Sequence, residues 1–200
     1  MKNVEYVILS DIATLSVGYP FRNTCIPGDS GVLACFLRDV DLDGSLNVNC
    51  LKRVEDAKPN ASHLAVADDI VFRSRGVSFV SAVVPPLGED LLVVAPMIRI
   101  RVDSTRVLPE YLAWYINGAN GAAYFKEFAK GTAMPLISKS VLEKMPIMDR
   151  KYYIDKYVEY VNMRNAAMEG GDSSTTSNIS NYTSMSQGLN GDDIAEELGF

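Results

Sequence analysis

The chain has 200 residues, 48% of them hydrophobic, which is enough to bury one ordinary core and a small additional element. Its 19 Lys and Arg against 25 Asp and Glu give a net charge of -6, which excludes a uniformly basic nucleic-acid-binding protein. Six of the acids lie from Glu169 onward, where there is no Lys or Arg, so residues 1–168 hold 19 charges of each sign. This neutral part can still present a local basic face to phosphates.

The cysteines and the hydrophobic runs indicate the cellular setting. Three cysteines are an odd number, and the N-terminus lacks the basic start and apolar run of a signal peptide, so we expect a reducing cytoplasm. The longest apolar runs, such as residues 91–97, are far shorter than the ~20 residues of a membrane helix. A zinc site from Cys25, Cys35, Cys50 and His63 is conceivable, but their spacing is irregular and contains no C-x-x-C. We therefore expect small buried cysteines, and neither a metal nor another cofactor.

The first two thirds of the chain read as short strands. Residues 32–37, 70–75, 79–84 and 91–102 are rich in β-branched and aromatic residues and are bounded by Gly, Pro, Asp or Asn. Such a series predicts a curved, mostly antiparallel sheet. Within residues 97–102 apolar and basic residues alternate, which places Arg99 and Arg101 on the face opposite the buried one. That face is either solvated or directed toward DNA.

Helices are predicted after Leu108. Pro109 suits a first helical turn, and Gly118 can end that helix in a left-handed cap. Asn120 is the expected N-cap of a second helix, which Gly131 is placed to stop. Together these signals predict two short helices that follow each other directly.

The last quarter of the chain changes in character twice. Ser138 is the expected cap of a small helix over residues 139–145, which Pro146 ends. Asp149 caps a predicted amphipathic helix over residues 149–168, about 30 Å long. Its apolar stripe is formed by Ile154, Tyr157, Val158 and Val161. Residues 169–200 are rich in Ser, Asn and acids, which is typical of a flexible tail.

Several short motifs follow one another in a recognisable order. They are Leu-Ser-Asp-Ile-Ala at residues 9–13, Gly-Tyr-Pro-Phe-Arg at 18–22, Leu-Ala-Val-Ala-Asp-Asp-Ile-Val-Phe-Arg-Ser-Arg-Gly at 64–76, Leu-Pro-Glu-Tyr-Leu-Ala-Trp-Tyr-Ile at 108–116 and Lys-Gly-Thr-Ala-Met-Pro-Leu-Ile-Ser-Lys at 130–139. In this order and spacing, residues 4–150 resemble a target recognition domain of the specificity subunit of type I restriction-modification systems. Each motif is degenerate, so the series as a whole carries the resemblance.

The resemblance implies an α+β domain whose sheet and loops lie along a DNA groove. Residues 1–148 would be this domain, residues 149–168 the spacer and dimerisation helix, and residues 169–200 the tail. Family members usually carry two such domains, so this chain would be a half-length specificity protein that pairs with itself or with a second half. Its partners would be double-stranded DNA and the methyltransferase and restriction subunits of the same system. The apolar stripe on residues 149–168 is the expected pairing surface.

DNA contacts need cations for phosphates and polar side chains for base edges. The candidates that meet this need are Arg22, Arg38, Arg73, Arg75, Lys130, Thr132 and Lys139. Arg73 and Arg75 rank first, because residues two apart on a strand share one face. Lys139 stands in the first turn after Ser138, where backbone N–H groups also favour an anion.

Two other classes of protein compete with this interpretation. The chain contains no Gly-rich dinucleotide loop, no P-loop, no H-E-x-x-H and no G-x-S-x-G, and its single histidine stands in a polar loop, which argues against an enzyme. The second alternative is a protein-interaction module or regulator that has the same fold but does not read DNA. The neutral charge and the acidic tail favour this module, whereas the paired arginines favour DNA.

Overall fold

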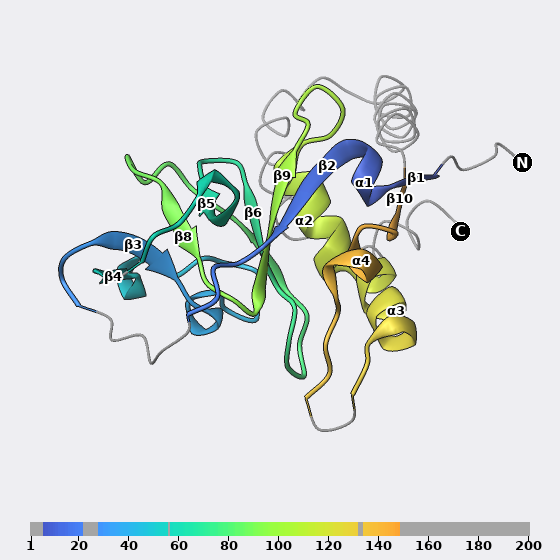
Figure 1. Cartoon of the computed structure of the whole chain (residues 1–200). Coiled ribbons are helices and arrows are strands. Elements are labelled where there is room, and N and C mark those ends of the chain that lie inside the picture. The colour runs from blue at the N-terminus through green and yellow to red at the C-terminus, as the bar shows by residue number, and fades with distance from the viewer. Residues whose placement is uncertain (1–5, 22–27, 56, 132–133, 149–200) are drawn as a thin grey trace, which may run out of the picture. The chain divides into compact units, whose positions relative to one another are not determined.

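The computed structural model describes residues 6–21, 28–55, 57–131 and 134–148 (Figure 1). Contacts divide the chain into one unit of residues 7–147 and another that combines residues 1–6 with 148–200. The first unit contains nearly all of the described residues. The predicted helix over residues 149–168, with its stripe, and the tail over 169–200 lie outside the described residues.

The first sheet is wholly antiparallel and has four strands. Their order is β2 (Ala13–Val17), β9 (Met97–Val102), β6 (Ile70–Arg73) and β7 (Ser81–Val83). β6 is a central strand, and it continues into a loop that leads to β7. The strands predicted over 70–75 and 79–84 are thus present, each slightly shorter than expected.

The second sheet is mixed. Its order is β4 (Lys52–Val54), β3 (Val32–Cys35), β8 (Leu91–Val93) and β5 (Leu64–Ala65), with β3 and β8 parallel and the other pairs antiparallel. A two-stranded sheet of β1 (Tyr6–Ile8) and β10 (Pro146–Met148) completes the strands of the described chain. The prediction of an α+β fold with mostly antiparallel strands and short helices is confirmed.

The prediction of one continuous strand over residues 91–102 is wrong. The run is divided into β8 and β9, which belong to different sheets. A turn separates them, closed by the N–H of Met97, which donates to the carbonyl of Val94 at 3.1 Å. Pro96 lies inside this turn and has no N–H for a ladder, which makes it a natural point of interruption. Hydrophobicity alone did not reveal this boundary, because both strands are buried.

The helices are α1 (Leu9–Ile12), α2 (Pro109–Asn117), α3 (Ala119–Phe128) and α4 (Lys139–Leu142), together with the short 3-10 turns Leu37–Asp39, Val48–Cys50 and Ala61–His63. Pro109 opens α2 as predicted. Gly118 is not left-handed: its φ is -80° and its ψ is -172°, and it caps α3, so Asn120 lies inside that helix. A Cβ on Gly121 would come within 1.8 Å of the Ile116 carbonyl oxygen, so glycine permits this tight turn between the helices.

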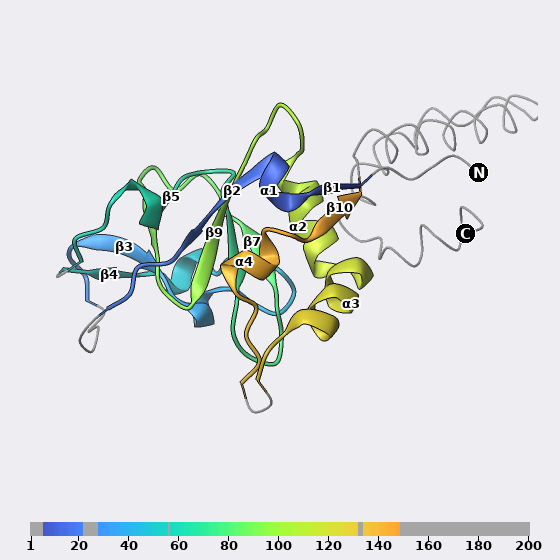
Figure 2. The same cartoon turned by 45° about the vertical axis from the view of Figure 1, so that its right-hand side comes forward.

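The core lies on both faces of the first sheet. One face packs against the second sheet through a cluster of buried side chains that includes Val71, Ala82, Leu91 and Val93. On the other face the ring of Phe72 lies 5.3 Å from that of Phe125 in α3. Figures 1 and 2 show α2 and α3 on one side of this sheet and the second sheet on the other. The central strand β6 is therefore held from both sides, which fixes the position of the loop that follows it.

Candidate nucleic-acid interface

Two candidate DNA-binding residues that are far apart in the sequence lie on either side of Leu136. The N–H of Lys130 donates to the Leu136 carbonyl at 3.0 Å, and the N–H of Leu136 donates to the Lys130 carbonyl at 2.8 Å. On its other side Leu136 forms an antiparallel bridge with Arg75. Directly opposed residues of antiparallel segments project to the same face, so Arg75 and Lys130 project together. Both side chains are exposed, while Leu136 is half-buried.

Backbone hydrogen bonds hold the two outer segments to the middle one. The N–H of Ile137 donates to the Ser74 carbonyl at 2.9 Å, and the N–H of Gly76 donates to the Pro135 carbonyl at 3.0 Å. Gly76 has φ +117°, a conformation that other residues adopt only with strain. We call this arrangement of residues 74–77, 130–131 and 134–137 the Leu136 ribbon. In Figure 1 the loop between β6 and β7 runs beside the segments that connect α3 to α4.

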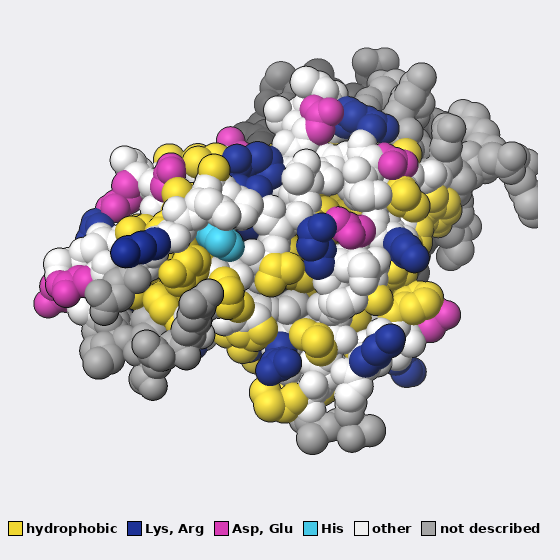
Figure 3. All heavy atoms as spheres, viewed as in Figure 1, with side chains coloured by type: hydrophobic (Ala, Val, Ile, Leu, Met, Phe, Trp, Pro, Cys, Tyr) yellow, Lys and Arg dark blue, Asp and Glu magenta, His cyan; other side chains and the backbone are white. Residues whose placement is uncertain are grey.

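The chain around the ribbon is positively charged in spite of the overall charge of -6. Neither residues 70–88 nor residues 128–142 contain an Asp or a Glu. Together these two segments contain Arg73, Arg75, Lys130 and Lys139. In Figure 3 the lower part of the visible face carries separated Lys and Arg side chains among hydrophobic and uncharged ones. Most Asp and Glu side chains lie along its upper and left margins, so the positive charge is local.

Arg73 is placed differently from Arg75, although only Ser74 separates them. Arg73 is half-buried, and its Nη1 donates to the Val40 carbonyl at 2.8 Å. Its Nε is buried and has no hydrogen-bond partner within the part of the chain that the structure describes. Arg73 therefore connects the end of β6 to the loop after β3, whereas Arg75 remains available at the surface.

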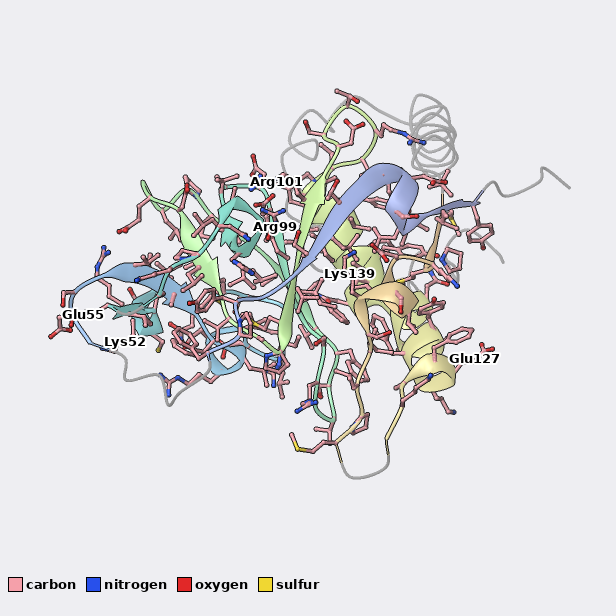
Figure 4. The ribbon with its side chains drawn as sticks, in the orientation of Figure 1. Lys52, Glu55, Arg99, Arg101, Glu127 and Lys139 are labelled. Atoms are coloured by element: carbon pink, nitrogen blue, oxygen red, sulfur yellow. The ribbon has the colours of Figure 1, made fainter. Side chains whose placement is uncertain are left out.

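The remaining predicted residues are spread over the molecule. Arg38 is exposed beside the buried Asp39, with its guanidinium over the ring of Phe36 at 5.4 Å. Lys139, labelled in Figure 4, is the first residue of α4, and its Nζ lies 2.7 Å from Oε1 of Glu143. Arg22 and Thr132 lie outside the described residues. The structure thus brings together Arg75 and Lys130 among the seven candidates, and places Lys139 shortly after the ribbon.

Arg99 does not project from an open strand face, so the sequence-based interpretation of β9 is wrong at this position. Only 4% of Arg99 is exposed. Its guanidinium donates to the carbonyls of Ala61 and Leu64 at 3.1 and 2.8 Å and to the Ser16 hydroxyl at 3.2 Å. The turn after β4 covers this face of β9, which the alternation could not reveal. Burial lowers the pKa of the Arg99 guanidinium, and so does the neighbouring Arg101.

Arg101 is half-exposed and also has a partner inside the protein. It donates from Nε to Oδ1 of Asp69 at 2.9 Å and from Nη2 to Oδ2 at 2.6 Å. This bidentate hydrogen bond raises the pKa of the Arg101 guanidinium. Arg99 and Arg101 lie next to each other in Figure 4, and both stabilise the loops around β5.

The described residues contain no group of His, Cys, Asp and Glu suited to a metal ion. Cys35 is buried, as predicted for a structural cysteine, and burial raises the pKa of its thiol, which keeps it protonated. Cys50 is exposed, which corrects the prediction of burial there, and Cys25 lies outside the described residues. None of the described helices has the length and hydrophobicity needed to cross a membrane.

Comparison with known proteins identifies this architecture. No protein-family model matches the sequence, and no curated protein is significantly similar to it. The structure matches a chain from work on complex assembly and conformational transition of the type I R-M system, with 13% identity and a TM-score of 0.55. It also matches the HsdS subunit from Thermoanaerobacter tengcongensis, with 12% identity and a TM-score of 0.51. The chain has the fold of a type I specificity subunit.

These matches cover 84% of the chain but only 44% of each of the two solved chains. The chain thus spans less than half the length of a solved HsdS subunit, which is consistent with a single target recognition domain. The resemblance that the sequence motifs indicated is confirmed at the level of the fold. At this level of identity the comparison identifies the specificity-subunit fold.

Proposed function

We propose that this chain is a half-length DNA-recognition subunit of a type I restriction-modification system and performs no catalysis itself. The observation that carries the proposal is the Leu136 ribbon, which presents Arg75 and Lys130 on one face. The specificity-subunit fold supports it, and exposed arginine and lysine side chains are groups that contact the phosphates and base edges of DNA.

The ribbon has the properties that a DNA contact requires. Arg75 provides a planar donor fork that suits either a phosphate or a guanine edge, and Lys130 provides a compact charge that suits a phosphate. Both backbones are fixed by hydrogen bonds to residues 134–137, so little order has to be gained on binding. Residues 70–88 and 128–142 carry only positive charges, which favours an approaching phosphate.

Selection from a random duplex library tests this proposal. The purified protein, alone and with the methyltransferase encoded by a neighbouring gene, would be incubated with the library at ~50 and ~200 mM salt. We expect enrichment of a short motif, with affinity that falls as salt rises. Arg75→Ala and Lys130→Ala should weaken binding, while Lys52→Ala, an exposed cation in β4, should not.

Failure of enrichment in both mixtures would contradict DNA reading and favour the alternative of a protein-interaction module. The hydrogen bonds of Arg73, Arg99 and Arg101 to other parts of the protein support this alternative, because they engage three cations within the fold. Retained binding to the methyltransferase in the absence of any DNA preference would establish it.

Pairing of two copies, or of this chain with a second half, is the further part of the proposal. The predicted stripe Ile154, Tyr157, Val158 and Val161 would form the contact, and methyltransferase and restriction subunits would bind the paired form. Light scattering of the wild type and of Val158→Asp tests it. We expect a dimer for the wild type and a monomer for the variant, and a monomeric wild type in the presence of DNA and methyltransferase would contradict homodimer formation.

A further inference from the structure

Two exposed hydrophobic side chains stand at the end of the Leu136 ribbon. Val77 is 91% exposed and Met134 is 62% exposed, among the largest values for hydrophobic residues in the described chain. Neither residue belongs to a charged or polar motif, so the sequence alone does not mark them. The pairing of residues 74–77 with residues 134–137 brings both side chains to the same end of the ribbon.

The backbone pairing places these two residues at the same end of the ribbon. The bridge between Arg75 and Leu136 is antiparallel, and beyond it the N–H of Gly76 donates to the Pro135 carbonyl at 3.0 Å. Val77 follows Gly76 and Met134 precedes Pro135, so the two residues stand directly beyond this hydrogen bond, one on each segment. Gly76, with φ +117°, turns the chain at this point, and both side chains protrude where the pairing ends.

Single exposed hydrophobic residues are common on protein surfaces and need no explanation. Leu42 is such a residue: it is 68% exposed and stands between Asp41 and Asp43. The pair Val77 and Met134 differs, because it is part of a ribbon that carries two cations and is flanked by segments without an acid. The charge around the pair therefore favours an anionic partner with an apolar group at its centre.

Duplex DNA offers this combination in its major groove. Phosphates line both edges of the groove, and its floor carries the 5-methyl groups of thymine, which apolar side chains can contact. We propose that Val77 and Met134 contact thymine methyl groups in the recognised site while Arg75 and Lys130 contact the flanking phosphates. This inference rests on the proposed function and adds a chemical class of base contact to it.

Replacement of thymine by uracil in the selected duplex tests the contact, since uracil differs from thymine by the absent methyl group alone. We expect the wild type to bind the thymine duplex about fourfold more tightly for each methyl group that its side chains cover. The double variant Val77→Ala, Met134→Ala should bind both duplexes equally and about as weakly as the wild type binds the uracil duplex. Because both side chains are exposed, the variant should fold normally, which circular dichroism would verify.

The matched control is Leu42→Ala, which also removes an exposed apolar side chain but lies between two acids. It should retain the full preference for thymine. Selective binding to DNA without any preference for thymine over uracil, a selected motif that lacks thymine, or an unchanged preference in the double variant would overturn this inference alone. Absence of selective DNA binding would overturn both this inference and the proposed function.

Discussion

The side-chain amide of Asn117 pairs with the backbone of Ser81 as a neighbouring strand would. The N–H of Ser81 donates to Oδ1 of Asn117 at 2.8 Å, and Nδ2 of Asn117 donates to the Ser81 carbonyl at 2.8 Å. The Ser81 hydroxyl adds a third hydrogen bond to Oδ1 at 2.9 Å. Because β7 is an edge strand of its sheet, the last residue of α2 satisfies backbone groups that the edge would otherwise leave unpaired.

This relationship predicts an unusual ranking of substitutions at Asn117. Asn117→Ala should lower the free energy of unfolding by about 2 kcal/mol, because it leaves a buried N–H and carbonyl without partners. Asn117→Asp should cost more, since a carboxylate oxygen would face the Ser81 carbonyl in the place of Nδ2. Urea unfolding measures both changes. Equal stability of the wild type and the Asp variant would contradict the reciprocal pairing.

The ion pair of Arg101 and Asp69 should contribute to stability more than a surface ion pair does. Only 3% of the Asp69 side chain is exposed, and its carboxylate also accepts from the Val66 N–H at 2.9 Å. Arg101→Met would leave this buried carboxylate without its cation, and we expect a loss of about 3 kcal/mol in urea unfolding. The stability of Arg101→Lys should lie between those of the wild type and Arg101→Met, because Lys keeps the positive charge but cannot form the bidentate hydrogen bond.

Arg53 and Glu89 provide the matched comparison for that experiment. This pair is also bidentate, but its side chains are 33% and 41% exposed. Arg53→Met should therefore lower the free energy of unfolding clearly less than Arg101→Met does. If both arginine substitutions had the same effect, burial of Asp69 would not be the reason for the larger loss.

Much of the fold could be predicted because its signals are local. Pro109 and Ser138 mark helix starts by chemistry that involves only the next few residues. The strands around Val71 and Ala82 are apolar runs with turn residues on both sides. The turn at Pro96 was missed because a run of buried residues has the same composition whether it forms one strand or two in different sheets.

The burial of Arg99 shows the limit of the same reasoning. Alternation along β9 indicates which residues share a face of the strand, but it does not indicate which other segment covers that face. Here the covering residues, Ala61 and Leu64, are distant in the sequence and provide carbonyl acceptors for the guanidinium. For the same reason the sequence offered Arg75 and Lys130 as separate candidates, while their common position depends on both pairing with Leu136.

Salt dependence of DNA binding should separate the cations that contact phosphates from those that support the fold. Arg75→Ala and Lys130→Ala should each reduce the slope of log K against log salt by about 0.9, the value expected when one phosphate contact is lost. Arg73→Met should lower stability, because Arg73 donates to the Val40 carbonyl, but leave the slope unchanged. Fluorescence anisotropy between ~50 and ~200 mM salt measures the slope. An unchanged slope in both Ala variants would remove the ribbon from the interface.

Two aspartates should give the folded state opposite responses to acid. Burial raises the pKa of Asp39, although the Phe36 N–H donates to Oδ2 at 2.8 Å and Arg38 lies nearby. Hydrogen bonds from the hydroxyl and N–H of Ser45 lower the pKa of Asp43. A carboxyl with a raised pKa takes up its proton first in the folded state, and one with a lowered pKa takes it up first in the unfolded state.

The sign of each effect follows from this difference in proton uptake. As pH falls from about 7 to about 4, the wild type should gain stability relative to Asp39→Asn, because folded Asp39 is protonated above the ordinary carboxyl pKa. Below about pH 4 it should lose stability relative to Asp43→Asn, since the unfolded chain binds the proton at Asp43 at the ordinary carboxyl pKa and the folded chain only at a lower pH. Urea unfolding of the three proteins at several pH values measures both trends. If the stability of the wild type changed with pH in the same direction relative to both variants, the opposite pKa shifts of Asp39 and Asp43 would be contradicted.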